Sequence, residues 1–322
     1  MDMNWLDSGK ILGQQITCSQ AMSILSAGDE QLPAIFSATT AIRRAKFGDR
    51  AILCSILNAK SGACSEDCVF CSQSAHHNTA IEQYPMLDAE RILTAHDEAS
   101  AMPIERFGIV TSGRGLRDEE LASLIDIIRA RPDCGASFCA SLGVLSEEQL
   151  TRLAGAGLKR YHHNLETAES FFPNICTTHT YDDRKQTVLA AKRAGLEVCC
   201  GGLFGLGETQ AHRVELAMAI CDLQVDAIPL NFLVAHEDTE IARREIPALT
   251  AADILKTIAM FRLVCQDVEI KVCAGREKHL GDMENQIFAA GATGMMIGGY
   301  LTVQGREVND DLEMIRDAGM RP

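Results

Sequence analysis

Short apolar runs alternate along the chain with segments in which apolar residues recur every three or four positions. Short apolar runs predict buried strands, and the longer spacing predicts amphipathic helices. We expect strands at residues 51–57, 106–111, 136–141, 159–164, 196–203, 227–234, 269–274 and 294–297. We expect helices at residues 87–102, 118–131, 146–157, 182–194, 209–223, 250–264 and 284–290. The pattern therefore predicts a repeated strand–helix order over most of the chain.

Such a series of strand–helix units predicts an α/β fold with a parallel sheet, closed into a (β/α)8 TIM-type barrel. An open doubly wound sheet is the alternative. Before the first strand, apolar residues at helical spacing predict an N-terminal helical extension over residues 1–50, which leaves residues 51–322 for the barrel. In such barrels the functional residues lie at the carboxyl ends of the strands, and the chemically distinctive side chains of this chain fall there.

Composition and charge exclude several classes of partner. The formal charge is −14, the pI is near 5.1, and no basic stripe stands out, so a nucleic acid partner is not expected. No apolar run approaches about 18 residues, so no membrane span is expected. The N-terminal residues lack the pattern of a secretory signal, and we expect a cytoplasmic protein.

The chain has 13 cysteines, which is many for a compartment in which disulfides are rare. Most are therefore expected to be free, ligating or reactive. Five have no obvious partner and are expected to be ordinary small side chains: Cys18, Cys54, Cys176, Cys221 and Cys265.

Three cysteines, Cys64, Cys68 and Cys71, follow the first predicted strand in a C-x3-C-x2-C spacing. Thiolates so close together select soft metals, either zinc or an iron–sulfur cluster. A structural zinc ion needs four protein ligands, and His76 or His77 could supply the fourth. The alternative is a four-iron cluster with three protein ligands, whose open iron can bind and reduce a small molecule.

Two further groups lie at predicted strand ends. Residues 201–209 hold the densest run of glycines, which predicts either a tight strand-to-helix turn or a backbone edge beside a ligand. Asn164 and Glu166 are two positions apart on an extended segment, so they share a face and could bind a ribose diol.

A second set of cysteines falls on three different predicted strands, and it consists of Cys139, Cys199, Cys200 and Cys273. These thiols are either merely buried or the ligands of a second, deeper iron–sulfur cluster. In the second case Arg276, at the end of the same predicted strand as Cys273, could neutralise the charge of the cluster or serve as an unusual ligand.

The early cysteine spacing, with the aromatic Phe70 before the third cysteine, resembles the motif of the radical S-adenosylmethionine (SAM) enzymes. After residue 50 the chain further resembles the biotin synthase family over nearly all its length. The segments that carry this resemblance are residues 61–71, 163–167, Cys199, 201–209, 229–233, 274–277 and 298–302.

The resemblance implies a complete barrel, usually a homodimer, that inserts sulfur between two unactivated carbons of dethiobiotin to form biotin. Deoxyadenosyl radicals, one from each SAM, remove a hydrogen from each carbon, and the sulfur comes from an auxiliary cluster. A reduced flavodoxin or ferredoxin is the implied electron donor.

The resemblance also implies roles for individual residues. Cys64, Cys68 and Cys71 would hold the [4Fe–4S] cluster that binds SAM. The residues implied at the SAM side are Asn164, Glu166, Arg184, Gly205 and Phe70. Asn164 and Asn231 would contact dethiobiotin. Cys139, Cys199 and Arg276 match three of the four ligands of the auxiliary [2Fe–2S] cluster of the family.

The chain departs from the family at the auxiliary cluster. The fourth ligand, a cysteine in the family, falls at Gly108, whereas Cys200 and Cys273 stand where serine is usual. Cys139, Cys199 and Cys273, with Cys200 in reserve, could instead hold a four-iron cluster with an extra sulfide. Cys273 is favoured over Cys200 because Cys199 and Cys200, being adjacent on a strand, face opposite ways.

A second departure is His162, which stands where asparagine is usual near the substrate. Two alternatives to biotin synthesis stay open from the sequence. One is a related radical SAM enzyme of another purpose, either hydrogenase-maturase-like or methylornithine-synthase-like. The other is a non-catalytic iron–sulfur carrier.

Overall fold

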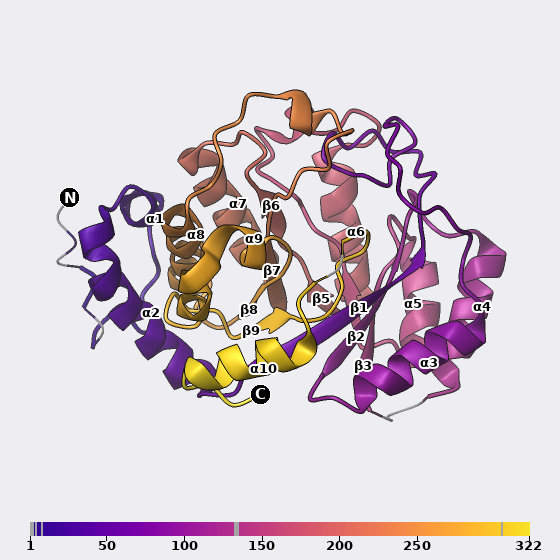
Figure 1. Cartoon of the computed structure of the whole chain (residues 1–322), viewed down its shortest axis with the longest axis horizontal. Coiled ribbons are helices and arrows are strands. Elements are labelled where there is room, and N and C mark those ends of the chain that lie inside the picture. The colour runs from indigo at the N-terminus through magenta and orange to yellow at the C-terminus, as the bar shows by residue number, and fades with distance from the viewer. Residues whose placement is uncertain (1–2, 4, 8, 132–134, 304) are drawn as a thin grey trace.

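The structure is a computed structural model that describes residues 3, 5–7, 9–131, 135–303 and 305–322. Its parallel strands form one sheet in the order β5-β4-β3-β2-β1-β9-β8-β7-β6, and a further pairing between β5 and β7 closes the sheet into a barrel (Figure 1). The strands are β1 (Ile52–Lys60), β2 (Arg106–Thr111), β3 (Ser137–Ser141), β4 (Arg160–His162), β5 (Glu197–Cys199), β6 (Gly202–Phe204), β7 (Ala227–Phe232), β8 (Glu269–Val272) and β9 (Gly294–Met296).

The predicted strand over residues 196–203 is split into β5 and β6. Both pieces pair with β7, since Cys199 lies opposite Ala227 and Gly202 lies opposite Leu230. They are therefore successive parts of one position in the sheet, which gives the barrel eight positions. The closed barrel that the sequence predicts is confirmed, and the open sheet is wrong.

The break between β5 and β6 falls at Gly201, where two backbones approach closely. A Cβ atom on Gly201 would lie 1.9 Å from the carbonyl oxygen of Pro229. We expect Gly201→Ala to lower the free energy of unfolding by about 1–3 kcal/mol, because overpacking forces the backbone to shift. Urea unfolding monitored by circular dichroism measures the change.

Gly155 provides the matched control for this substitution. It lies inside α5 (Glu147–Ala156), and a Cβ atom there would meet nothing within 4 Å. Gly155→Ala is expected to raise stability slightly, because alanine favours a helix interior over glycine by about 1 kcal/mol. Equal effects of the two substitutions would contradict the close approach at Gly201.

Helices cover the outside of the barrel (Figure 1). The remaining barrel helices are α3 (Ala89–Ser100), α4 (Asp118–Arg129), α6 (Tyr181–Arg193), α7 (Gln210–Leu223), α8 (Ala251–Val264), α9 (Arg276–Leu280) and α10 (Val308–Asp317). As predicted, Ser146 caps the start of α5, and its side-chain oxygen accepts a hydrogen bond from the amide of Gln149. Near residues 284–290, where a short helix is expected, the structure has a 3-10 helix, Gly281–Ile287, which follows α9 directly. The sequence analysis missed α10.

Two N-terminal helices, α1 (Cys18–Leu25) and α2 (Leu32–Phe47), lie against the outer side of α8 (Figure 1). Thr39 donates a hydrogen bond to the carbonyl oxygen of Ala289 at 2.6 Å, and Lys256 pairs with Asp29 at 2.8 Å. Because α8 is covered on both sides, most of its residues are buried. The boundary between an extension and the barrel at residue 50 stays a prediction. Residues 1, 2, 4 and 8 of that extension lie outside the described residues.

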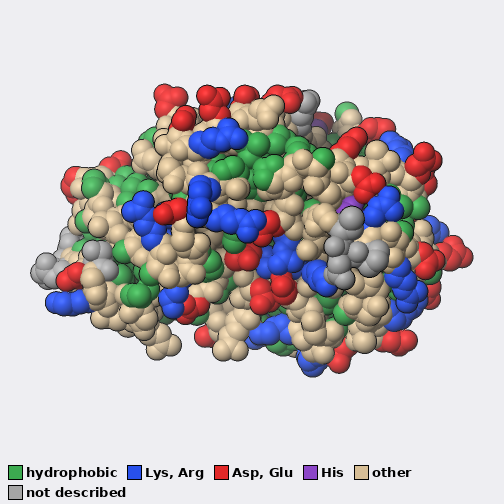
Figure 2. Space-filling model, turned by 90° about the horizontal axis from the view of Figure 1, so that it is seen from below, with side chains coloured by type: hydrophobic (Ala, Val, Ile, Leu, Met, Phe, Trp, Pro, Cys, Tyr) green, Lys and Arg blue, Asp and Glu red, His purple; other side chains and the backbone are tan. Residues whose placement is uncertain are grey.

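No helix in the described part of the chain is long and apolar enough to cross a membrane. On the face shown in Figure 2, acidic and basic side chains are interspersed.

Candidate active site

The cysteine loop follows β1 and folds back on itself. The amide of Cys64 donates to the carbonyl oxygen of Gln73 at 3.0 Å, and the amide of Cys71 donates to that of Cys68 at 3.0 Å. Burial raises the pKa of the Cys71 thiol to about 11, while backbone N–H groups of Gln73 and Ser74 pull it down by hydrogen bonding to the sulfur. Amide donors aimed at a thiolate are a feature of iron–sulfur sites, so this loop fits a cluster.

The same loop is fastened to the segment between β4 and α6. An oxygen of Asp67 accepts hydrogen bonds from the amides of Thr177 and Thr178, at 2.9 and 3.1 Å. The amide of Val69 donates to the carbonyl oxygen of Ile175 at 3.0 Å. The loop that carries the three cysteines is thereby positioned against the carboxyl ends of the strands.

His76 and His77, the predicted alternative ligands for zinc, bind the backbone of the loop instead. The Nε2 atom of His76 is 3.1 Å from the carbonyl oxygen of Ser65, and that of His77 is 3.1 Å from the carbonyl oxygen of Cys68. Neither belongs to the group of possible metal ligands around Cys68 among the described residues.

Asn164, Glu166 and Arg184 form one hydrogen-bonded group. Arg184 Nη1 donates to the carbonyl oxygen of Asn164 at 3.0 Å and lies 3.4 Å from a carboxylate oxygen of Glu166. Asn164 lies beyond the end of β4, so the strand is shorter than predicted. Glu166 has a φ of 70°, a left-handed conformation that is uncommon outside glycine and concentrates at functional sites.

The glycine run packs against this group. The amide of Gly201 donates to the side-chain oxygen of Asn164 at 3.0 Å, and the amide of Leu203 donates to the carbonyl oxygen of Glu166 at 2.8 Å. A Cβ atom on Gly202 would lie 2.6 Å from that same carbonyl oxygen. The first glycines of the run are thus required by close backbone approach.

The rest of the run forms a turn into α7. Glu208 accepts hydrogen bonds from the amides of Gly205 and Leu206, at 3.1 and 2.7 Å, and pairs with Arg213 at 2.9 Å. The tight turn, one of the two structures that the glycine run predicts, is therefore present. A contact between Gly205 and SAM stays a prediction, as does one with Phe70, which packs partly buried against the core.

The deeper cysteines share the barrel interior. Strand register places Cys139 opposite Arg160, and His162 opposite Cys199. Burial raises the pKa of Cys199 to about 12, Arg160 and Lys271 lower it, and nearby thiolates, Cys139 among them, raise it. Cys273, which follows β8, is buried, and a charge on Cys199 raises its pKa. Three of the predicted auxiliary ligands are thus close enough to influence one another.

Cys200 has different neighbours. Burial raises its pKa, and besides Cys199 the groups that act on it are the backbone of Leu165, the carboxylate of Glu166 and the guanidinium of Arg184. It belongs to the packed hydrophobic core, which Cys199 does not. The preference for Cys273 over Cys200 as a ligand agrees with this placement.

Cys54 is a functional candidate that the sequence analysis missed. It lies on β1, opposite Arg106 on β2 and Met296 on β9. A charge on Cys54 raises the pKa values of Cys139, Cys199 and Cys273, so its thiol belongs to the same interior group. Residues 51–57 form a largely apolar run in which Cys54 does not stand out. Successive side chains of a strand point to opposite faces of the sheet, so this alternation could have identified Cys54 as a residue that points into the barrel.

Buried cations lie beside these thiols, and they too were missed. Arg160 pairs with Glu269 at 2.7 Å and with Glu197 at 2.8 Å, and Lys271 lies 3.5 Å from Glu269. Both cations lower the pKa values of Cys54, Cys139 and Cys199. Positive charge beside a set of thiolates offsets the desolvation of a buried anionic cluster.

Arg276 begins α9 and is fully buried. Its terminal nitrogens pair with Glu284, with Asp311 at 2.7 Å and with Glu277 at 3.2 Å. Its Nε is buried and has no hydrogen-bond partner among the described residues. Its charge acts on Cys273, so Arg276 adjoins the interior thiols with one donor unused.

Two of the three residues predicted near the substrate, Asn231 and His162, lie near the carboxyl ends of β7 and β4. Asn231 bridges neighbouring strands, since its side chain donates to the carbonyl oxygen of Gly202 and accepts from the amide of Ala274, both at 3.3 Å. Burial, together with the charge of Arg184, lowers the pKa of His162 to about 4, so its imidazole is neutral near pH 7.

The position of the missing auxiliary ligand, Gly108 on β2, lies opposite Cys139 on β3.

A closed parallel barrel that carries a C-x3-C-x2-C loop after its first strand defines the radical SAM class. The family model described as the Radical SAM superfamily matches residues 59–220, and the Biotin and Thiamin Synthesis associated domain matches residues 229–321. A protein named biotin synthase from Trichlorobacter lovleyi is 46% identical over 316 residues, which cover 97% of this chain and 94% of that protein. A protein named biotin synthase from Pelotomaculum thermopropionicum is 44% identical over 306 residues, which cover 95% of this chain and 95% of that protein. The chain belongs to the biotin synthase family.

Solved structures share the fold at much lower identity. Methylornithine synthase superposes with a TM-score of 0.84 at 18% identity, covering 98% of this chain and 96% of its own. The hydrogenase maturase HydG from Carboxydothermus hydrogenoformans gives 0.78 at 17% identity, covering 96% and 76%. These likenesses show the fold alone, so they give no support to the maturase-like or methylornithine-synthase-like alternatives.

Proposed function

We propose that this chain makes biotin from dethiobiotin by radical insertion of a sulfur atom. The observation that carries the proposal is the presence of two separate groups of thiols. One lies on the loop after β1, and the other lies inside the barrel beside Arg160 and Lys271. Cleavage of SAM needs only the first group, so the second group must serve a further step, and we assign it the donation of sulfur. The identity of 46% to a biotin synthase supports the same function.

In this proposal Cys64, Cys68 and Cys71 hold a [4Fe–4S] cluster, which when bound supplies the electron that cleaves SAM and so produces the hydrogen-abstracting radical. Glu166 and Asn164 position SAM, and Arg184 fixes their orientation from α6. Asn231, Asn164 and the neutral His162 bind dethiobiotin. The neutral state of His162 leaves it one donor and one acceptor.

The interior thiols hold the auxiliary cluster, whose contribution is the sulfur atom. Cys139, Cys199 and Cys273 are its proposed ligands, and Cys54 is added as a fourth thiolate. Gly108 supplies no ligand, so the usual [2Fe–2S] ligand set is incomplete. Four thiolates can hold either a two-iron or a four-iron cluster without an arginine ligand, and we propose the four-iron form. The unused Nε of Arg276 then serves as a donor beside the cluster rather than as a ligand.

Metal analysis tests this cluster assignment. Two four-iron clusters predict about eight irons per anaerobically reconstituted chain. A [2Fe–2S] spectrum beside that of the SAM cluster would contradict the four-iron assignment and leave sulfur insertion itself untouched.

Replacing Glu166 by glutamine is expected to weaken SAM binding. The substitution keeps the shape of the side chain and removes the charge that pairs with Arg184. We expect the KM for SAM to rise by about 10-fold, because a charge-assisted hydrogen bond contributes roughly 1.5 kcal/mol or more. Rates of 5′-deoxyadenosine formation over a range of SAM concentrations measure it. An unchanged KM would contradict the role of Glu166.

Three further features belong to the proposal. A reduced flavodoxin or ferredoxin supplies electrons, and the chain works as a homodimer, as is usual in the family. A cytoplasmic location suits thiols that must stay reduced, and the described cysteines are all free.

The direct test is to incubate reconstituted protein with dethiobiotin, SAM and a strong reductant and to assay biotin. Biotin together with 5′-deoxyadenosine is expected. SAM cleavage without biotin would point to a related radical SAM enzyme, and the absence of SAM cleavage would point to an iron–sulfur carrier.

A further inference from the structure

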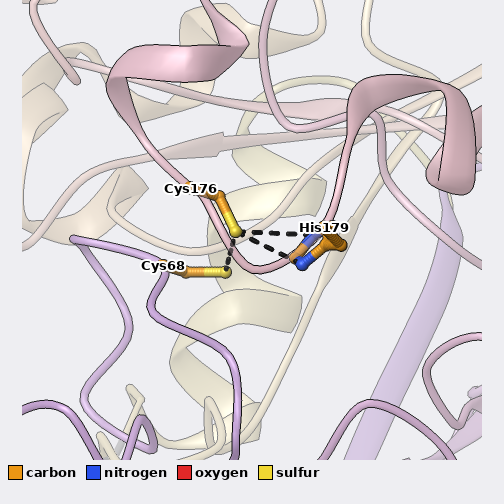
Figure 3. Close-up of side chains that lie close together, drawn as sticks. All are labelled: Cys68, Cys176 and His179. Carbon is orange, nitrogen blue, oxygen red and sulfur yellow. Dashed lines mark hydrogen bonds between the residues drawn. The ribbon is translucent and has the colours of Figure 1, made fainter.

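Cys68 has two further neighbours besides the cysteines of its own loop. Cys176 and His179 lie between β4 and α6, and their ligand atoms and the sulfur of Cys68 all lie within 4.8 Å of one another (Figure 3). The two sulfur atoms are 3.8 Å apart, and the Cys176 sulfur is 3.8 Å from His179 Nε2. All three side chains are buried. None of the roles proposed above uses Cys176 or His179 as a ligand.

The separation of the two sulfurs matches that between ligands of one tetrahedral zinc ion, and the separation of the Cys176 sulfur from His179 Nε2 is a few tenths of an ångström longer than the ideal. With Zn–S bonds of about 2.3 Å and Zn–N bonds of about 2.0 Å, two sulfurs lie roughly 3.8 Å apart and a sulfur lies roughly 3.5 Å from a nitrogen. We propose that the cluster-free protein binds one Zn²⁺ ion through Cys68, Cys176 and His179. A water molecule completes the tetrahedron, as is usual where the protein supplies three ligands.

The surroundings of His179 suit a metal ligand. Its Nδ1 lies 2.6 Å from a carboxylate oxygen of Glu66, which orients the ring in the way that carboxylates orient zinc-binding histidines. Its Nε2 currently accepts a hydrogen bond from Arg184 Nε at 3.0 Å, which the metal would displace. Arg184 keeps its bond to the carbonyl oxygen of Asn164. Asp67, 3.1 Å from the Cys176 sulfur, adds negative charge beside the cation.

The site shares Cys68 with the proposed SAM cluster, so one thiolate cannot serve both metals. Zinc bound at this site therefore blocks assembly of the [4Fe–4S] cluster until it is removed. Only this competition rests on the proposed function; the zinc site itself does not. Cys176 and His179 are thus a second set of ligands for Cys68. Whether the cluster assembles depends on whether zinc or iron binds to the loop first.

Cobalt titration of the full-length, iron-free, reduced protein tests the site. Co²⁺ replaces Zn²⁺ in tetrahedral sites and reports thiolate ligation by its visible spectrum. We expect one tight, zinc-displaceable Co²⁺ in the wild type and also in the double variant Cys64→Ser/Cys71→Ser. Affinity should fall at least about 10-fold in Cys176→Ala and in His179→Gln. Cys265→Ala, which removes a buried thiol elsewhere, should bind like the wild type.

Two results would overturn the site. One is tight cobalt binding that survives Cys176→Ala but disappears in Cys64→Ser/Cys71→Ser, because the three loop cysteines would then hold the metal. The other is a wild type that binds no cobalt with thiolate character. Thermal melts of each variant identify any loss of binding caused by unfolding, and His179→Gln provides a second variant if Cys176→Ala unfolds.

Cluster reconstitution in the presence of Zn²⁺ tests the competition. Zinc should slow the appearance of iron–sulfur absorbance in the wild type much more than in Cys176→Ala, which retains Cys64, Cys68 and Cys71. Equal inhibition of both proteins would contradict the competition. Neither experiment uses dethiobiotin, so its outcome is independent of the outcome for biotin synthesis.

Discussion

Cys273→Ser is expected to abolish biotin formation while SAM cleavage remains measurable. Cys273 lies inside the barrel, where the charges of Cys54, Cys199 and Lys271 act on it. It is not one of the three proposed ligands of the SAM cluster. Gly108 has no side chain that could replace a lost ligand. We expect biotin formation to fall more than about 100-fold, beyond the cost of losing an outer-sphere partner of a metal.

The measurement is a paired assay of biotin and 5′-deoxyadenosine, with an iron and sulfide count for each preparation. Cys18→Ser is the matched control, because Cys18 is exposed on α1 and belongs to neither group of thiols. The Cys273→Ser variant should lose the iron of the auxiliary cluster and keep the iron of the SAM cluster. Undiminished biotin formation by Cys273→Ser would remove Cys273 from the sulfur-donating site.

Cys71→Ala is expected to eliminate SAM cleavage and biotin formation together. Backbone groups of Gln73 and Ser74 act to lower the pKa of the Cys71 thiol, and Cys71 shares a loop with Cys64 and Cys68. A cluster that is deprived of one of three protein ligands is not held in the orientation that binds SAM. Formation of 5′-deoxyadenosine under strong reduction should therefore fall to background.

Cys221→Ser on α7 is the control for this variant, since its sulfur interacts with the carbonyl oxygen of Val264 and with the thiol of Cys265 and belongs to neither group of proposed cluster ligands. Its rates should equal those of the wild type. Cleavage of SAM by Cys71→Ala at a rate close to the wild type would show that this loop does not hold the catalytic cluster.

The sequence predicted the barrel well because buried parallel strands produce apolar runs, and amphipathic helices produce a distinct spacing. It predicted the cysteine loop because the three ligands lie within one short segment. It did not predict the break between β5 and β6, which depends on how closely Gly201 approaches Pro229, a contact between distant parts of the chain. The 3-10 segment Gly281–Ile287 likewise depends on tertiary packing.

The candidate sites were predicted less completely, for a similar reason. Cys54 joins Cys139, Cys199 and Cys273 only when the sheet closes, because these residues come from separate strands. Cys176 and His179 reach Cys68 only because hydrogen bonds to Asp67 fasten two loops together. Sequence spacing identifies ligands that are neighbours along the chain, whereas these groups are neighbours through the fold.

The origin of the inserted sulfur tests the central claim most directly. Protein is reconstituted with ³⁴S-labelled sulfide, freed of excess sulfide, and incubated with dethiobiotin, SAM and reduced flavodoxin; the biotin is then examined by mass spectrometry. The account predicts biotin carrying ³⁴S, in an amount limited by the auxiliary clusters present. Biotin whose sulfur is unlabelled, or SAM cleavage that leaves dethiobiotin unchanged, would contradict it.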